Sequence, residues 1–373
     1  MNPFSYGTIV RGDHFYDRKE ECGRIVSTLS GGNNLVLFAP RRYGKTSLVF
    51  RATEQLEQQG FTCIYFDFLP VYSLETFVNL YINAIQKKQS NLQKLVQTVS
   101  AIVKNIRPKL TFDSSGTPEF GIDFMESKVS METISDVLDL PEKISHSGEK
   151  TIVIFDEFQE ITKLNKYGFE NLLRSKIQQQ QQVNYLFLGS RTHLLNDMFN
   201  NKNRAFYNSA SLMQIGTLPR EDTIAFLQAK FKDSGIEIDY GTAMFIIGQS
   251  GDIPYYIQLL AAEIWQYMIN SLSKVTEEIV RLCTNRIVEM KQDYYYELFD
   301  RQSVMQKQLL KALAQSGEGV FSADFAKRFR LSTASTTQKA VLVLMDSSII
   351  DKTDNTYFIS DPFFKRFIQN YAL

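Results

Sequence analysis

The run from residue 39 to residue 47 has the composition of a phosphate-binding loop. Its residues are Ala39, Pro40, Arg41, Arg42, Tyr43, Gly44, Lys45, Thr46 and Ser47. The run matches the Walker A pattern, Gly-x-x-x-x-Gly-Lys-Ser/Thr, except that alanine occupies the first glycine position. In such a loop, successive backbone N–H groups face phosphate oxygens and the following helix N-terminus adds partial positive charge. We expect Lys45 to reach the β- and γ-phosphates of a nucleotide and Thr46 to offer its hydroxyl to Mg²⁺.

A pair of carboxylates follows an apolar run further along the chain, as in a Walker B pattern. Residues 151–155 read Thr-Ile-Val-Ile-Phe, and Asp156 and Glu157 come next. Ligands of an open parallel sheet lie beyond the carboxyl ends of its strands. We therefore expect Asp156 to hold Mg²⁺ through water and Glu157 to orient or polarise an attacking water molecule. Acid pairs at strand ends are common on protein surfaces, and it is the phosphate loop upstream that favours this functional interpretation.

Ser190 and two arginines are further candidates for contacts with a phosphate group. Ser190 follows the apolar run at residues 185–188, where a polar side chain can touch the γ-phosphate or the attacking water. An ordinary turn is the alternative interpretation. Arg191 and Arg204 are the nearby arginines that can stabilise transition-state charge, within the chain or from a neighbouring subunit. Solvated or ion-paired arginines are the alternative for both.

Four short apolar runs predict the strands that position these residues. The runs are Leu35–Ala39, Thr62–Phe68, Thr151–Phe155 and Tyr185–Leu188. Each is continuously apolar, which is typical of a parallel sheet covered by helices on both faces. The fold class predicted is α/β, a P-loop NTPase core over residues 1–217. A segment inserted near residues 73–131 should contain a helix over Ser73–Ile106 and a hairpin over Pro108–Phe124.

Helical periodicity replaces the strand pattern after residue 217. We predict an all-α lid over residues 218–302, with helices at Arg220–Asp233, Tyr240–Gln249, Pro254–Leu272 and Thr276–Phe299. Residues 303–373 should form a winged helix-turn-helix, because three helical stretches precede two short apolar runs, the order typical of that domain.

Length, charge and cysteine usage exclude several other classes of protein. The chain has 373 residues, with 41 basic and 41 acidic side chains, so no overall charge attracts it to nucleic acid or to an anionic membrane. The three cysteines and three histidines are scattered, so neither a disulfide framework nor a zinc site is expected. No signal peptide or membrane span is evident, and we expect a soluble, cytoplasmic protein without membrane contact.

These motifs, in this order, resemble the archaeal-type ATPase family, a branch of the P-loop ATPases close to AAA+ and STAND proteins. The resemblance covers nearly the whole chain and includes alanine at the first position of the phosphate loop. Residues 11–21 resemble the family's opening Phe-x-x-Arg-x-x-Glu segment, which implies that Arg18 lies near the adenine of ATP. Residues 250–256 resemble the Gly-x-Pro signature of the lid, which implies that Pro254 packs near the nucleotide. Gly251 and Pro254 are equally suited to ending one helix and opening the next.

The resemblance also covers the C-terminal end of the chain and fails at one position. Residues 361–364, Asp-Pro-Phe-Phe, resemble the family's closing segment after the winged helix. Relatives tend to carry arginine in a Tyr-x-Arg-Ala stretch after the sensor strand, whereas residues 206–210 here read Phe-Tyr-Asn-Ser-Ala. An arginine-finger mechanism therefore does not transfer directly to this chain.

The partner of the winged helix is left open between DNA and protein. Residues 303–373 carry nine basic and six acidic residues, and the candidate recognition helix after Ser332 offers Lys339 and no arginine. The leading hypothesis is an ATP-binding, Mg²⁺-dependent ATPase with slow turnover that acts as a conformational switch. A non-hydrolysing signalling or scaffold module and an oligomeric, DNA-associated AAA+-type motor or loader are the alternatives.

Overall fold

The computed structural model describes residues 2–8, 18–88, 92–104, 106–112, 118–124, 129–145, 150–270, 274–353 and 356–372. By their contacts the residues divide into two compact units. The sheet unit comprises Lys19–Ala39 and Leu48–Ile215. The helical unit comprises Met1–Arg18, Pro40–Ser47 and Gly216–Leu373.

The sheet unit is built on five parallel strands. They are β1 (Leu35–Phe38), β2 (Thr62–Asp67), β5 (Thr151–Asp156), β6 (Val183–Gly189) and β7 (Ser211–Gln214), in the spatial order β2-β5-β6-β1-β7. The four strands expected from the sequence are confirmed to within two residues at each end. Strand β7 was missing from the prediction, because its residues Ser-Leu-Met-Gln are half polar and only Met213 is buried, with Ser211 and Gln214 exposed.

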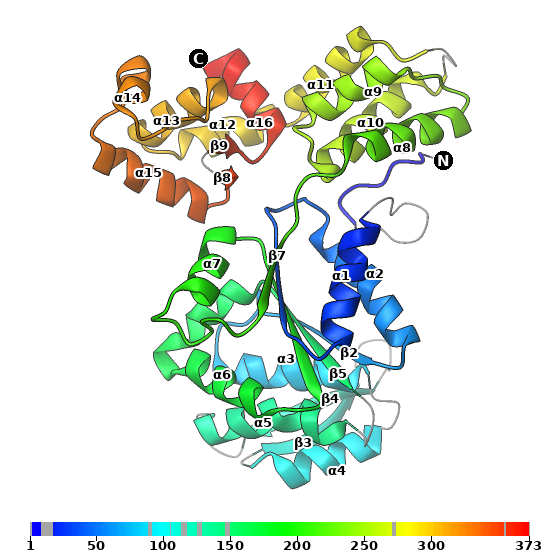
Figure 1. Ribbon diagram of the computed structural model, residues 1–373, viewed down its shortest axis with the longest axis vertical. Coiled ribbons are helices and arrows are strands. Elements are labelled where there is room, and N and C mark those ends of the chain that lie inside the picture. The colour runs from blue at the N-terminus through cyan, green and yellow to red at the C-terminus, as the bar shows by residue number, and fades with distance from the viewer. Residues whose placement is uncertain are drawn as a thin grey trace. The chain divides into compact units, whose positions relative to one another are not determined.

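Helices cover both faces of this sheet, as the continuously apolar strands require. The helices around this sheet are α1 (Lys19–Ser30), α2 (Lys45–Gln58), α3 (Leu74–Gln86), α4 (Leu92–Ile102), α5 (Met131–Ile144), the 3₁₀ helix η2 (Phe158–Tyr167), α6 (Phe169–Gln179) and α7 (Thr192–Asn200), of which α4 packs on α5. Figure 1 shows α1 and α2 on one side of the sheet and α6 and α7 on the other. The core between the layers is rich in aromatic rings, among them Phe66, Phe77, Tyr81, Phe155 and Phe158, all at most 2% exposed.

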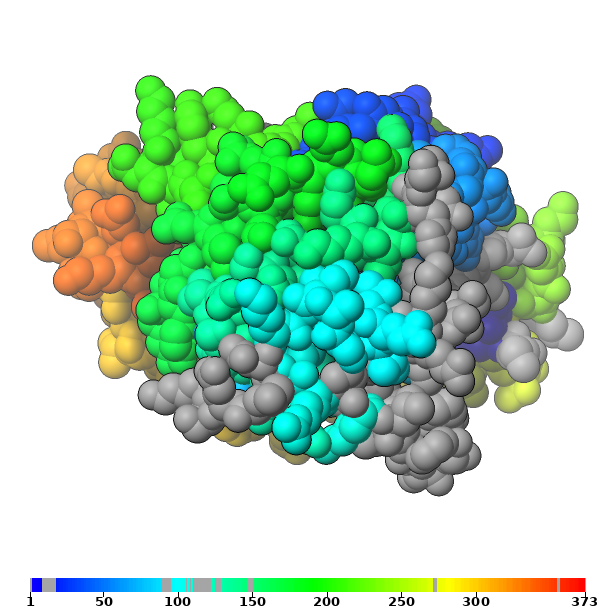
Figure 2. Space-filling view, turned by 90° about the horizontal axis from the view of Figure 1, so that it is seen from below, coloured from blue at the N-terminus to red at the C-terminus, as the bar shows by residue number. Residues whose placement is uncertain are grey.

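The inserted segment differs from its prediction in one respect. The single helix expected over Ser73–Ile106 is wrong: α3 and α4 are separate helices, and Ile106 begins strand β3 (Ile106–Phe112). The residues that follow α3, Lys-Lys-Gln-Ser-Asn at 87–91, are all polar and cannot continue its buried face. The predicted hairpin is confirmed, since β3 pairs antiparallel with β4 (Pro118–Phe124). Figure 2 shows residues of α4 at the surface of the sheet unit.

The helical unit contains the segments expected to form the lid. These are α8 (Arg220–Asp233), α9 (Tyr240–Gln249), α10 (Pro254–Met268), α11 (Glu277–Met290) and α12 (Gln292–Asp300). The helix expected over Thr276–Phe299 is divided in two, because Lys291 leaves the helical conformation at ψ 8°. Phe4 of the N-terminal segment packs on this layer, with its ring 4.7 Å from that of Phe231.

The same unit contains the elements of the winged helix. They are α13 (Val304–Gln315), α14 (Ala323–Phe329), α15 (Ala334–Asp346), the antiparallel pair β8 (Ile350–Thr353) and β9 (Thr356–Ile359), α16 (Pro362–Phe367) and η3 (Ile368–Ala372). The predicted order of three helices and a two-stranded ribbon is therefore confirmed. Among the described residues of the whole chain, no helix is both long enough and apolar enough to cross a membrane.

Candidate functional site

Three neighbouring strands bring the predicted polar residues to one edge of the sheet. Strand β6 lies between β1 and β5, and all three run in the same direction. The register pairs Phe38 with Gly189 and Phe155 with Phe187, so the three strands end at nearly the same level. Ala39, which opens the phosphate loop after β1, the acid pair at the end of β5 and Ser190 after β6 all lie at this edge of the sheet.

The phosphate loop has a backbone suited to binding an anion. Ala39 and Pro40 are buried, Arg42 and Gly44 have φ values of 75° and 79°, and α2 begins at Lys45. Left-handed residues within a loop turn successive N–H groups toward one side. Gly44 is the residue type that accepts this conformation without strain. Lys45, 8% exposed, and Ser47, 9% exposed, are buried, whereas Thr46 is half-buried.

Asp156 is a buried carboxylate whose two oxygens are both hydrogen-bonded. It is 7% exposed. The backbone N–H of Glu157 donates to Oδ1 at 2.8 Å, and the hydroxyl of Tyr65 donates to Oδ2. Burial, together with the charge of Asp156, raises the pKa of Tyr65 far above its usual range, so the phenol remains a donor.

Glu157 is directed toward the end of β6. Its backbone is left-handed, with φ 47°, and its Oε2 accepts hydrogen bonds from Ser190 Oγ at 2.8 Å and from the side-chain amide of Gln159. Two candidate residues from separate motifs, Glu157 and Ser190, are thus in contact. Gln159 was not identified from the sequence, since nothing in its surroundings marks it as different from other residues that follow a strand.

Gly189 permits this close arrangement. A Cβ atom at this position would lie 2.3 Å from Gln159 Oε1 and 2.5 Å from Leu195 Cδ1. A larger residue at this position would require the ends of both side chains to shift.

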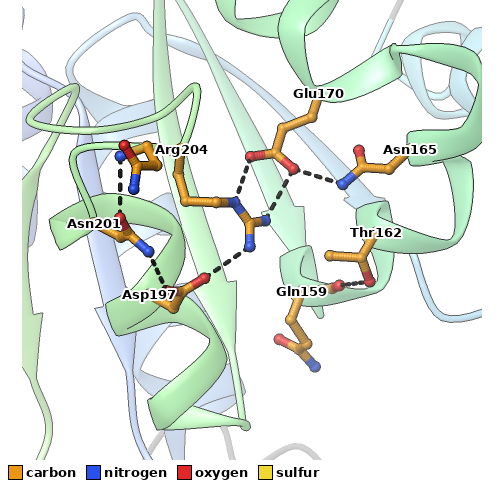
Figure 3. A network of polar contacts seen from close by, with 8 residues as sticks. Gln159, Thr162, Asn165, Glu170, Asp197, Asn201 and Arg204 are labelled. Carbon is orange, nitrogen blue, oxygen red and sulfur yellow. Dashed lines mark hydrogen bonds and ion pairs between the residues drawn. The ribbon is translucent and has the colours of Figure 1, made fainter.

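The two arginines considered for catalysis have different surroundings. Figure 3 shows the guanidinium of Arg204 between the carboxylates of Glu170 and Asp197. It forms two bonds to Glu170, of 3.2 and 2.9 Å, and one of 2.8 Å to Asp197. Burial opposes the charge of Arg204, but these carboxylates outweigh that effect and raise its pKa. Arg204 therefore belongs to an ion-pair network within the sheet unit. The Nη2 atom of Arg191 lies 4.0 Å from Oε1 of Glu160.

Arg18 is connected to the backbone of the phosphate loop. It is 2% exposed, and its Nη2 donates to the carbonyl oxygens of Tyr43, at 3.2 Å, and Gly216, at 2.8 Å. The bond to Tyr43 holds the backbone of the phosphate loop at that residue. Residues 11–17 of the predicted opening segment lie outside the described residues.

Arg42 joins the phosphate loop to two other parts of the helical unit. Its carbonyl oxygen accepts a bond from the N–H of Tyr255 at 3.3 Å, and its guanidinium lies 4.9 Å from the ring centres of Tyr255 and Tyr256. These two residues follow Pro254, the first residue of α10. The guanidinium also contacts Asp361 Oδ2, at 3.2 Å, immediately before α16. We call these residues the Arg42 cluster.

Asp361 organises the winged-helix side of this cluster. Its Oδ1 accepts from the N–H groups of Phe363, at 2.9 Å, and Phe364, at 3.2 Å, and thereby caps α16. Its Oδ2 accepts from the hydroxyl of Tyr295 at 3.1 Å as well as from Arg42. One carboxylate therefore fixes a helix end and holds the guanidinium of the phosphate loop.

The exposed face of α15 has mixed character. Lys339 is exposed there, but Leu342 is 49% and Val343 is 52% exposed. Three exposed basic residues, Lys327, Arg328 and Arg330, lie at the end of α14. The face therefore presents basic residues beside an exposed apolar pair.

Comparison with known proteins decides the family. Residues 15–260 match the model of the ATPase domain that occurs predominantly in Archaea. The chain belongs to this family. Residues 293–370 match the model of a probable winged helix domain. The recognised family and the predicted fold class, a P-loop parallel sheet with a winged helix, are thereby confirmed.

Individual relatives agree with this assignment. The chain is 24% identical over 222 residues to an uncharacterized ATP-binding protein, PH0541, of Pyrococcus horikoshii; the match spans 57% of this chain and 65% of that protein, less than two thirds of its length. The structure is similar to the Walker-type ATPase PABY2304 of Pyrococcus abyssi, with a TM-score of 0.65, 17% identity, and 98% and 99% of the two chains covered. It also resembles the ORC2 protein of Aeropyrum pernix, with a TM-score of 0.50, 10% identity, and coverage of 99% and 97%. These two structures support the fold alone.

Proposed function

We propose that the protein binds ATP with Mg²⁺ and hydrolyses it slowly, and that the bound nucleotide controls contacts of the lid and the winged helix. The observation that carries this proposal is the left-handed loop that joins β1 to α2, in a chain whose strand order brings the end of β1 and the acid pair to one edge of the sheet. A loop of this kind binds phosphate through backbone N–H groups and the helix N-terminus. In the proposal residues 39–47 hold the phosphates, Lys45 neutralises their charge, and Arg18 and Pro254 lie near the nucleotide.

The residues at this edge fit Mg²⁺. Asp156 offers a buried carboxylate and Thr46 a half-buried hydroxyl, and Mg²⁺ prefers such oxygen ligands. Within the described parts of the chain, no group of three or more His, Cys, Asp or Glu residues forms a metal cage. This agrees with an ion held by few protein oxygens, since Mg²⁺ usually retains water and binds substrate phosphates. The bound ion would neutralise charge on the phosphates.

Glu157 is the residue proposed to orient the attacking water. Its carboxylate accepts hydrogen bonds from Ser190 and Gln159, which fix its direction. Ser190 is positioned by the same contact to lie beside the water or the γ-phosphate. Ser209 occupies the place of the arginine that relatives tend to carry, and Arg204 is engaged with two carboxylates, so neither position supplies cationic assistance. Turnover should therefore be slow.

The test of hydrolysis is ATP turnover by the wild type and by Glu157→Gln, each with and without duplex DNA. We expect the variant to lose at least about 100-fold in turnover, as typical general-base contributions imply. Glu142→Gln is the matched control, because Glu142 is a half-buried acid that accepts hydrogen bonds of 3.1 and 2.9 Å from the backbone N–H groups of Gln181 and Gln182, directly before β6. Equal turnover in wild type and Glu157→Gln, with ATP still bound, would favour the non-hydrolysing signalling or scaffold function.

The Arg42 cluster is proposed to report the state of the nucleotide. Phosphate charge at the loop competes with Asp361 for the guanidinium of Arg42, which biases the contacts with α10 and α16. Trp265, the only tryptophan of the chain, lies in α10 and provides a natural probe. We expect ATP to change its fluorescence in the wild type and the change to be largely lost in Asp361→Asn. Asp324→Asn, which alters an exposed acid of α14, is the control and should respond like the wild type.

We propose that the winged helix binds a partner through the exposed basic residues of its helix α14. Stimulation of turnover by duplex DNA, lost when Lys327, Arg328 and Arg330 are replaced by glutamine, would identify DNA as the partner and favour the motor or loader function. Assembly into an oligomer with ATP would support the same alternative. No effect of DNA would direct the search to proteins, for which the exposed Leu342 and Val343 are suited.

A further inference from the structure

The hydroxyl of Tyr65 reaches Asp156 from the neighbouring strand. Strands β2 and β5 are paired so that Asp67 lies opposite Asp156 and Tyr65 lies opposite Ile154. Tyr65 is thus two residues before the position facing Asp156, on the same side of the strand. Its hydroxyl donates to Oδ2 while the backbone N–H of Glu157 donates to Oδ1. The two carboxylate oxygens are held by separate donors, which fixes the plane of the carboxylate.

The ring of Tyr65 is itself held in place. Phe50 of α2 stacks on it, with ring centres 5.4 Å apart and planes inclined by 25°. A tyrosine hydroxyl lies in the ring plane, so two side-chain torsions determine its position, and a stacked neighbour restricts both. Helix α2 begins in the phosphate loop. The chain segment that leaves the loop therefore restrains the donor to Asp156.

We propose that Tyr65 is a positioning residue for Mg²⁺, which acts by orienting the carboxylate of Asp156. This inference rests on the proposed function, in which Asp156 binds the ion. Mg²⁺ requires nearly ideal octahedral geometry, so the direction of each ligand affects its affinity. Hydrogen-bond donors to ligating carboxylates typically contribute 10- to 100-fold to metal affinity.

A structural role is the competing explanation, because the hydrogen bond also satisfies a half-buried phenol. The chain offers a matched control in Tyr185 of β6. Its ring is buried, and its hydroxyl donates to Gln180 Oε1 in the loop before β6, so Tyr185→Phe removes the same kind of bond elsewhere in the sheet. A stability effect alone should appear in both variants, whereas an effect on Mg²⁺ should appear only in Tyr65→Phe.

The experiment measures binding of the non-hydrolysable β,γ-imido analogue of ATP by calorimetry, in EDTA and over a range of Mg²⁺ concentrations. For Tyr65→Phe we expect unchanged affinity in EDTA and a half-saturating Mg²⁺ concentration raised by about tenfold. Tyr185→Phe should match the wild type in both measurements. In the Asp156→Asn background, Tyr65→Phe should have no further effect, since the two residues act as one unit.

The outcomes separate this inference from the proposed function. If the wild type binds the analogue more tightly with Mg²⁺ and Tyr65→Phe needs the same Mg²⁺ concentration within twofold, the inference is wrong and the proposed function stands. If the wild type does not bind the analogue, or binds it without regard to Mg²⁺, the proposed function fails. Should Tyr65→Phe not fold, Phe50→Leu provides the test, because it loosens the ring and keeps the hydroxyl. A raised Mg²⁺ requirement in Phe50→Leu supports the inference, and an unchanged one contradicts it.

Discussion

The carboxyl edge of the sheet and the Arg42 cluster hold charged groups in contrasting ways. At the sheet edge, Asp156 is 7% exposed, and its oxygens accept hydrogen bonds from Tyr65 of β2 and from the backbone N–H of Glu157. In the Arg42 cluster, the side chain of Arg42 is 41% exposed and that of Asp361 is 16% exposed. Buried, preorganised groups favour chemistry because they need little reorganisation during the reaction. An exposed ion pair contributes at most about 1 kcal/mol to stability, so a bound ligand can replace one of its two partners. In the proposed function, the first region serves hydrolysis and the second serves the response to nucleotide.

The largest effect is expected on ATP binding, when two basic residues of the phosphate loop, Lys45 and Arg42, are replaced one at a time. Lys45→Ala should weaken ATP binding by about 10- to 100-fold, since hydrogen bonds to charged groups are worth about 1.5 to 3 kcal/mol. Arg42→Ala should change it by about threefold or less, because Arg42 is exposed and engaged by Asp361. Calorimetric titration with the imido analogue of ATP and Mg²⁺ measures both constants.

Thermal unfolding provides an independent check of this contrast. ATP at 100 times its dissociation constant adds about 2.7 kcal/mol to the free energy of unfolding. At about the ATP concentration that gives this stabilisation in the wild type, we expect the same stabilisation in Arg42→Ala but not in Lys45→Ala. Equal losses in the two variants would remove the distinction between the binding group and the reporting group.

The sequence predicted most of the sheet edge because its motifs are local. The phosphate loop and the acid pair of residues 156 and 157 each combine a β-rich apolar run with polar residues directly after it, and parallel strands bring such ends together. The helices of the lid and the order of the winged helix also follow from periodicity. These elements depend on residues that are close in the chain.

The remaining features depend on residues that are distant in the chain. The bond from Tyr65 to Asp156 joins positions 91 residues apart, and the bond from Arg42 to Asp361 joins positions 319 residues apart. No local pattern marks such pairs. Strand β7 was missed because only one of its four residues, Met213, is buried, which leaves too little apolar pattern to recognise.

A smaller effect is expected when the ion pairs of Arg204 are broken. Arg204 is, after Arg42, the second arginine held by carboxylates that we compare. Arg204→Met leaves the carboxylate of Glu170, with its side chain 7% exposed, without its cation. We expect a loss of about 2 kcal/mol in the free energy of unfolding, below the 3 to 5 kcal/mol typical of a fully buried pair because Arg204 is 26% exposed. Urea denaturation measures this value, and the affinity for ATP should stay within twofold of the wild type. A variant that folds normally but loses turnover would instead show that Arg204 takes part in catalysis.

The smallest effect is expected in the rates at which a reagent labels buried cysteine thiols of the two units, which compare their rigidity. Cys63 of β2 and Cys283 of α11 are at most 1% exposed, and burial raises the pKa of each to about 12. A raised thiol pKa keeps both residues protonated at pH 8, so a thiol reagent reacts only when the structure opens locally. Cys63 belongs to a strand whose six residues are all paired with β5, whereas Cys283 lies on α11, a helix that can move without disrupting a sheet. We therefore expect Cys283 to be labelled severalfold faster than Cys63, as measured by mass spectrometry of digested protein. Equal rates would mean that the sheet is no more rigid than the helical unit, and the contrast between a fixed catalytic edge and an exchangeable reporting cluster would then need another basis.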